Sequence, residues 1–210
     1  MLDLGCGDGV LGRAVLDQFP TAAGVLVDFS QPMLDAAQTR LAGQNVSLLA
    51  LDYGQLGWQE KLPVQQFDVI VSGFSIHHQP DARKKTLYAE LFELLSPSGI
   101  FLNLEHVASP TRGREAQHDD LFIEAMVAHQ ANMGEPKSYA EIAADYHVRP
   151  DKAANILAPV EAQCEWLREI GYAQVAVYLK IFELALFGGI REPDAEASGT
   201  GTPAAIFRRS

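Results

Sequence analysis

A short apolar strand that runs directly into alternating glycines most constrains what this chain can fold into. Residues 1–9 read Met-Leu-Asp-Leu-Gly-Cys-Gly-Asp-Gly, and a helical pattern follows over residues 10–19. Glycine allows positive φ angles and close approach of a ligand to the backbone amides, and the first turn of a helix offers unpaired N–H groups. The segment therefore predicts a strand, a turn and a helix that together bind a nucleotide-like cofactor.

A second predicted strand places a carboxylate beside this turn. Residues 25–27 are Val-Leu-Val, and Asp28 follows them nineteen positions beyond Gly9. In a doubly wound α/β fold, an acidic residue at the end of the second strand lies where a ribose diol binds. We therefore expect the glycine turn and Asp28 to hold two parts of one ligand.

The glycine spacing fits two kinds of cofactor. Gly7, Gly9 and Gly12 satisfy the G-x-G-x-x-G pattern of dinucleotide-binding folds. However, Asp3 lies inside the strand and Gly5 comes first, so the order is acidic residue, x, Gly, x, Gly, x, Gly. This order resembles motif I of the class I S-adenosylmethionine-dependent methyltransferases, which we favour. An NAD-dependent enzyme is the less favoured alternative.

The resemblance continues through the next strands of the chain. Residues 28–34, Asp-Phe-Ser-Gln-Pro-Met-Leu, are similar to the family's segment after the second strand, with Ser30 expected to cap the following helix. Asp52 follows a third strand over residues 46–51, and a fourth strand over 67–72 leads into Gly-Phe-Ser-Ile-His-His. The cofactor-binding residues that the resemblance implies are Asp3, Gly5, Cys6, Gly7, Asp28, Phe29, Met33, Asp52, Tyr53 and Ser72.

The resemblance also implies a role for several of these residues. The glycine turn is expected to face the methionine portion of S-adenosylmethionine, with Asp3 near its ammonium group and Asp28 on its ribose. The Asp52 carboxylate is expected to accept from the adenine amino group, and the backbone N–H of Tyr53 to lie near the ring. Met33 suits packing against a purine face, although ordinary core packing explains it equally well.

The fold that the resemblance implies is α/β, a doubly wound, Rossmann-like and mostly parallel seven-stranded sheet. An antiparallel hairpin closes the sheet, and a helical insertion follows the fifth strand. The pattern itself alternates strands with helices, as βαβ units do. Helices are expected at 10–19, 31–41, 82–95 and from Pro159 to Gly171, a turn at 96–99, a fifth strand at 100–104, and a closing strand pair at 175–178 and 181–187.

The chain reads as one methyltransferase domain over residues 1–191, followed by a tail over 192–210 that its composition predicts to be disordered. A helical cap insertion is expected at about 106–158, with helices at 119–131 and from the capping-box serine Ser138. Such an insertion would lie over the carboxyl ends of the strands and shape the substrate site. Most members of the resembled family carry several tens of residues before motif I, so we expect the chain to be truncated at its N-terminus.

Composition narrows the class of partner. A chain of 210 residues with 48% apolar content can bury one substantial core, and its formal net charge of −11 disfavours nucleic acid. The basic run at residues 83–85 is expected to be a solvated helix face. Because the chain has no apolar run of about twenty residues and no signal sequence, we expect no membrane partner and a cytoplasmic location. Cys6 and Cys164 are expected to be free thiols.

Metal binding is not expected from the sequence. His77 and His78 are adjacent and would point to opposite sides of an extended segment, and no cysteine or carboxylate cluster near them has zinc spacing. The catalytic candidates are Glu105 and His106, which end the fifth strand where a substrate would enter. Weaker candidates in the insertion are His129, Tyr139 and His147.

These observations predict transfer of a methyl group from S-adenosylmethionine to a small-molecule acceptor by in-line displacement. Alignment of the two reactants supplies most of the acceleration in such a reaction, so the prediction does not require a catalytic dyad. The alternative is a cofactor-binding module without turnover, because the segment that covers the cofactor in the resembled family is missing here. The acceptor atom is not specified by any motif, and association into a homodimer stays open.

Overall fold

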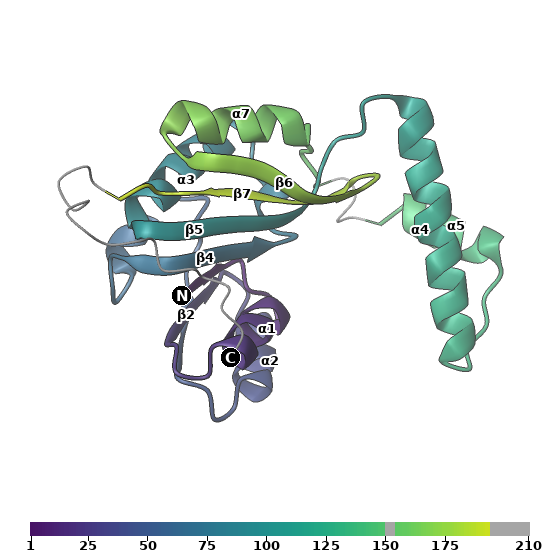
Figure 1. Cartoon of the computed structure of the whole chain (residues 1–210). Helices are drawn as coiled ribbons and strands as arrows, with labels where there is room; N and C mark the ends of the chain where they lie inside the picture. The colour runs from purple at the N-terminus through teal and green to yellow at the C-terminus, as the bar shows by residue number, and fades with distance from the viewer. Residues whose placement is uncertain (150–153, 194–210) are drawn as a thin grey trace.

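The structure, a computed structural model, describes residues 1–149 and 154–193 (Figure 1). Its strands are β1 (Leu2–Leu4), β2 (Gly24–Asp28), β3 (Val46–Ala50), β4 (Phe67–Gly73), β5 (Leu95–His106), β6 (Ala173–Ile181) and β7 (Leu184–Ile190). Within these residues they form a single sheet in the order β3-β2-β1-β4-β5-β7-β6. The tail over 192–210 was predicted to be disordered, and its residues 194–210 lie outside the described residues.

The sheet is parallel except at its closing hairpin. β1 pairs in parallel with both β2 and β4, which makes it a central strand, while β7 is antiparallel to both β5 and β6. The chain therefore has the doubly wound, mostly parallel seven-stranded sheet that was predicted, with the carboxyl ends of β1, β2 and β4 at one edge. Ligands of open α/β sheets bind at this edge.

Helices cover both faces of the sheet. They are α1 (Val10–Gln18), α2 (Gln31–Arg40), α3 (Asp81–Leu94), α4 (Arg112–Asn132), α5 (Tyr139–His147) and α7 (Val160–Ile170), with 3-10 turns η1 (Trp58–Lys61) and η2 (Ile76–His78). α1 and α2 pack on one face and α3 and α7 on the other (Figure 1). None of the described helices combines the length and apolar composition that a membrane crossing requires.

Side-chain alternation in β1 connects the two cores. Leu2 and Leu4 are fully buried in the larger core under α3 and α7, while Asp3 between them points to the α1 side and receives the backbone N–H of Gly12 at 2.8 Å. Successive side chains of a strand point to opposite faces, so an acidic residue between two core leucines must emerge under α1.

The helical insertion forms a hairpin of α4 and α5 that stands beyond the carboxyl ends of the strands (Figure 1). It has a small core of its own, formed by Ile123, Ile142 and Tyr146. The predicted capping box is confirmed, because Ser138 accepts from the backbone of Glu141 and the Glu141 side chain accepts from Ser138. α4 begins earlier than expected, since the Thr111 hydroxyl accepts from Arg114 N and caps it.

Two boundary predictions are wrong. The turn expected at 96–99 lies inside β5, where the register with β4 shifts between Phe67 and Val69 and the chain bulges with Ser98 at φ 69°. Arg191 N donates to Gly99 O at 3.0 Å and holds the bulge. The last two strands also divide differently, because Ile181 ends β6 instead of starting the final strand.

The expectation of a solvated basic face at residues 83–85 is correct for Lys85, which is exposed, but wrong for Arg83 and Lys84. Arg83 lies 2.8 Å from Glu90 and is largely buried, and Lys84 is 1% exposed. The Lys84 ammonium donates to Asp81 at 2.8 Å and to the Ile156 carbonyl. These cations hold the interior of the domain together, so they are not available as a patch for a polyanion.

Gly188→Ala tests the packing of the closing hairpin. A Cβ at this position would lie 1.9 Å from the Phe101 carbonyl oxygen and 2.9 Å from its carbon, both backbone atoms of β5. Since a strand backbone cannot yield without breaking the pairing, we expect a loss of about 3 kcal/mol in the free energy of unfolding, measured by urea denaturation.

The matched control is Gly113→Ala in α4, where the nearest atom, Thr111 Oγ1, is 4.0 Å from the added Cβ. This substitution is expected to leave stability unchanged or to raise it by up to about 1 kcal/mol. Equal losses in the two variants would contradict the packing argument.

Candidate functional site

The glycine turn after β1 is built from left-handed backbone conformations. Gly5, Gly7 and Gly9 have φ angles of 67°, 52° and 80°. Residues with a Cβ adopt this region at a cost, which explains the glycine at each alternate position. The backbone N–H groups of Gly5 and Cys6 both donate to Val27 O, at 2.8 and 2.9 Å. The turn is thereby held against the end of β2.

Asp28 ends β2 with its carboxylate fixed by backbone amides. Oδ2 accepts from Gly7 N at 2.9 Å and Oδ1 accepts from Ser30 N at 2.8 Å. Hydrogen bonds to an ionised acceptor are stronger than neutral ones, and each carboxylate oxygen keeps a further lone pair for a ligand. Ser30 is the residue before α2 but makes no capping bond with its side chain, so that prediction is wrong.

Asp3 is fully buried and only half satisfied. Oδ2 accepts from Gly12 N, whereas Oδ1 has no hydrogen-bond partner among the described residues. Burial raises the pKa of the Asp3 carboxyl to about 7, the Gly12 N–H opposes that rise, and the negative charge of Asp28 adds to it. A Cβ on Gly12 would lie 2.8 Å from Asp3 Oδ2. The lack of a side chain at Gly12 therefore allows α1 to pack close to Asp3.

The segment after β3 closes against the glycine turn. Tyr53 is buried, and its hydroxyl lies 2.5 Å from the Ser75 hydroxyl, while a Cβ on Gly5 would lie 1.8 Å from the same Ser75 oxygen. Burial raises the pKa of the Tyr53 phenol well above its usual range. Asp52 is exposed, and its Oδ1 accepts from Gly54 N at 2.8 Å. The structure thus brings Gly5, Tyr53 and Ser75 together.

The remaining predicted cofactor residues occupy different environments. Ser72 is fully buried, and its hydroxyl donates to Leu4 O at 2.7 Å, so it joins β4 to β1. Cys6 is buried in the core under α1 and α2, where burial raises the pKa of its thiol far above the usual range. Phe29 and Met33 are 75% and 47% exposed. Ordinary core packing therefore does not explain Met33.

Glu105 and His77 form a buried hydrogen-bonded pair that the sequence did not reveal. Glu105 Oε1 lies 2.5 Å from His77 Nδ1, Oε2 accepts from His77 N at 3.0 Å, and Oε1 also accepts from His106 N at 3.0 Å. Glu105 is fully buried, and its two hydrogen bonds to His77 fix the orientation of the imidazole ring. The available signal was that His77 follows β4 and Glu105 lies near the end of β5, which are neighbouring parallel strands.

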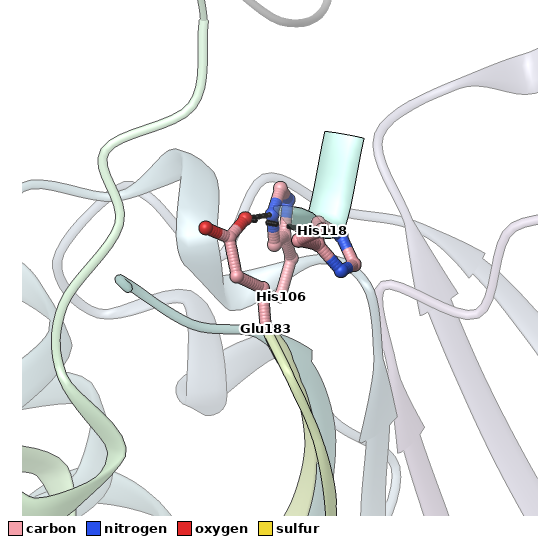
Figure 2. A group of neighbouring side chains, drawn as sticks. All are labelled: His106, His118 and Glu183. Atoms are coloured by element: carbon pink, nitrogen blue, oxygen red, sulfur yellow. Dashed lines mark hydrogen bonds and ion pairs between the residues drawn. The ribbon is translucent and has the colours of Figure 1, made fainter. Parts of the chain in front are cut away.

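The His106 side chain meets Glu183, which lies in the turn between β6 and β7 (Figure 2). Its Nε2 lies 2.7 Å from Glu183 Oε2. Burial alone would raise the pKa of the Glu183 carboxyl, but interactions with His106, the Ser109 hydroxyl and the charge of His118 outweigh it and lower the pKa. Glu183 was not a predicted site residue, because the pattern placed no turn there.

A segment that follows the insertion crosses the ends of β4 and β5. Ile156 N donates to His77 O at 2.9 Å, and Ala108 N donates to Ala158 O at 3.0 Å. His78 Nδ1 lies 3.3 Å from Ala154 O. These contacts cover the His77 backbone with a strap, residues 154–158, which no sequence signal predicted.

The weaker catalytic candidates belong to the α4–α5 hairpin. Tyr139 donates from its hydroxyl to Asp120 at 2.6 Å, and His147 Nδ1 lies 4.0 Å from Asp119. His129 is exposed on α4. The described contacts place none of these three beside the His77–Glu105 pair.

The amino-terminal half of the chain matches a known family. Residues 1–99 match the methyltransferase domain family. An uncharacterized methyltransferase of Mycobacterium tuberculosis is 35% identical over 112 residues, which are 53% of this chain and 53% of that protein. The demethylmenaquinone methyltransferase of Lactobacillus johnsonii is 34% identical over 103 residues, 47% of this chain and 40% of the relative. The chain therefore spans about half the length of these curated relatives, or less.

Solved structures share the fold over most of the chain. An O-methyltransferase family protein from Burkholderia thailandensis has a TM-score of 0.64 at 18% identity and covers 91% of this chain and 50% of its own. Human N-acetylserotonin methyltransferase in complex with S-adenosylmethionine has a TM-score of 0.57 at 14% identity, covering 92% and 47%. The family match covers residues 1–99, and these solved structures share with the chain the fold of its seven-stranded sheet.

Proposed function

We propose that this chain binds S-adenosylmethionine at the carboxyl ends of β1 and β2 and transfers its methyl group to a small-molecule acceptor. The observation that carries the proposal is the Asp28 carboxylate, which Gly7 N and Ser30 N fix at 2.9 and 2.8 Å beside three left-handed glycines. A carboxylate held in this way is prepared to accept from both hydroxyls of a ribose.

The buried Asp3 fits the other end of the same donor. Its Oδ1 is a buried acceptor without a partner among the described residues, and such an atom is costly unless a donor reaches it. The ammonium group of S-adenosylmethionine is a cationic donor of the required kind. The glycine turn lies between Asp3 and Asp28, so the residues present fit an elongated ligand with an amine at one end and a sugar farther along.

Residues at the ends of β4 and β5 would align the acceptor. When bound, S-adenosylmethionine supplies a methyl group on a sulfonium, and alignment of the reacting atoms supplies about 7–11 kcal/mol of the barrier reduction. Glu105 engages His77 Nδ1 at 2.5 Å, which leaves Nε2 as the ring nitrogen that can exchange a proton with an acceptor. Glu105 then acts through His77. The His106 ring lies beside the His77 ring, with 6.0 Å between their centroids.

The names of the relatives support the reaction more than the acceptor. One is a demethylmenaquinone methyltransferase, and another, from Priestia megaterium, is a malonyl-[acyl-carrier protein] O-methyltransferase that is 29% identical over 102 residues. These proteins differ in acceptor although they share the domain. The net charge of −11 and the interior position of Arg83 and Lys84 favour a small molecule over nucleic acid.

Asp28→Ala is expected to weaken binding of S-adenosylhomocysteine by about 1–3 kcal/mol, because the ribose hydroxyls of the ligand lose their acceptor in the site. Isothermal titration calorimetry on the whole chain measures the change. Asp35→Ala, at an exposed position of α2 whose side chain accepts from Gln31, is the matched control and should bind as the parent does. An unchanged affinity in Asp28→Ala removes this residue from the site, and binding of NADH in its place overturns the cofactor assignment.

The affinity for S-adenosylhomocysteine is expected to fall roughly tenfold between pH 8 and pH 6, because the pKa of Asp3 is raised to about 7 and its ionised form receives the ligand's ammonium. Affinity falls as the pH falls because, below pH 7, the Asp3 carboxyl holds a proton that the ammonium group of the ligand must displace. Asp3→Asn should bind more weakly and lose this slope. The same slope in both proteins would show that another group titrates.

Turnover separates an enzyme from a module that only binds the cofactor. We expect release of S-adenosylhomocysteine when the chain is supplied with S-adenosylmethionine and a panel of small phenols, quinols and carboxylic acids. Tight cofactor binding without product from any of them would support the binding module instead.

A further inference from the structure

We propose that His106, His118 and Glu183 form a binding site for a divalent transition-metal ion of the zinc type. Figure 2 shows the three side chains converging from three separate segments, the end of β5, the second turn of α4 and the turn between β6 and β7. The proposal concerns the chain itself and does not depend on methyl transfer.

The donor atoms already lie close to the distances that a metal requires. His106 Nε2 is 2.7 Å and His118 Nε2 is 3.8 Å from Glu183 Oε2, and one ligand atom from each residue falls within 4.8 Å of the others. Zinc bonds of about 2.0–2.2 Å in tetrahedral geometry put neighbouring ligand atoms roughly 3.4 Å apart. An ion would therefore replace the His106–Glu183 hydrogen bond after side-chain shifts of about 1 Å.

Burial distinguishes this group from a surface cluster. Glu183 is 3% and His118 is 5% exposed, and the aromatic rings of Phe122 and Phe182 lie 6.2 and 6.3 Å from the His118 ring. Glu183 Oε1 has no hydrogen-bond partner among the described residues. A carboxylate buried beside imidazoles and aromatic rings is costly, and a cation offsets that cost.

The donor set indicates which ions would bind. Two imidazoles and one carboxylate suit zinc, cobalt, nickel and ferrous iron, whereas magnesium and calcium prefer oxygen ligands throughout. Three protein ligands also leave at least one coordination position for water or another small ligand. The ion would join α4 to the sheet edge, because His118 belongs to the insertion and the other two residues belong to the sheet and its hairpin.

Sequence spacing could not reveal this site. His106 and His118 are twelve residues apart and Glu183 follows sixty-five residues later, which matches no metal motif. The adjacent pair His77 and His78, the conspicuous candidate in the sequence, is not part of the group. The expectation that the chain binds no metal depends on that pair and on the lack of a cysteine or carboxylate cluster with zinc spacing near it.

The test is a titration of the chelator-treated whole chain with Co²⁺, followed by visible absorption, with Zn²⁺ competing for the same site. We expect one equivalent to bind and Zn²⁺ to displace it. Since even the groups that support metal ligands contribute about 10–100-fold in affinity, loss of a ligand in His118→Ala or Glu183→Gln should weaken binding by at least about 100-fold.

His129→Ala, at an exposed histidine of the same helix, is the matched control and should bind Co²⁺ as the parent does. Circular dichroism melts show whether each variant folds, and Zn²⁺ should raise the melting temperature of the parent but not of Glu183→Gln. No stoichiometric Co²⁺ binding by the parent, or equal loss in His118→Ala and His129→Ala, would overturn the proposal and leave a hydrogen-bonded cluster only.

Discussion

The structure of the proposed cofactor site depends on two backbone amides that donate to one carboxylate and fix its orientation. Asp28 receives Gly7 N and Ser30 N, and these two donors belong to the turn after β1 and to the residue before α2. The same interaction therefore sets the path of the glycine turn and the start of the next helix. Because Val27 O receives two further amides of that turn, the end of β2 determines the shape of the site before any ligand is present.

A second constraint comes from acidic groups in the interior. Asp3, Glu105 and Glu183 are each at most 3% exposed, and each lies at or near the carboxyl edge of the sheet. Buried carboxylates are tolerated only with compensating donors or cations. Glu105 has three donors, whereas Asp3 and Glu183 each retain one oxygen without a partner among the described residues. Glu105, whose oxygens have donors within the protein, thus orients its neighbours. Asp3 and Glu183 each keep an oxygen that can receive a ligand.

Local pattern predicted the elements whose signals are local. The glycine turn, the carboxylate at the end of β2 and the capping box at Ser138 each depend on residues a few positions apart, and the structure contains all three. The sequence pattern predicts a turn at the Ser98 bulge, because the hydrogen bonds of the bulge involve Arg191, almost a hundred residues away. The His77–Glu105 pair and the Glu183 cluster escaped prediction for the same reason, since strand neighbours and hairpin turns bring them together.

The hydrogen bond from Ala108 N to Ala158 O has a consequence for how this domain can diversify. It joins the two ends of the inserted hairpin, and Val107 N and Ile156 N are fastened separately to Glu183 O and His77 O. The segment between these hydrogen bonds can be lengthened, shortened or exchanged without a change in the strand pairing of the sheet. A different helical appendage can therefore be attached at this place without a change in the sheet or in the glycine turn.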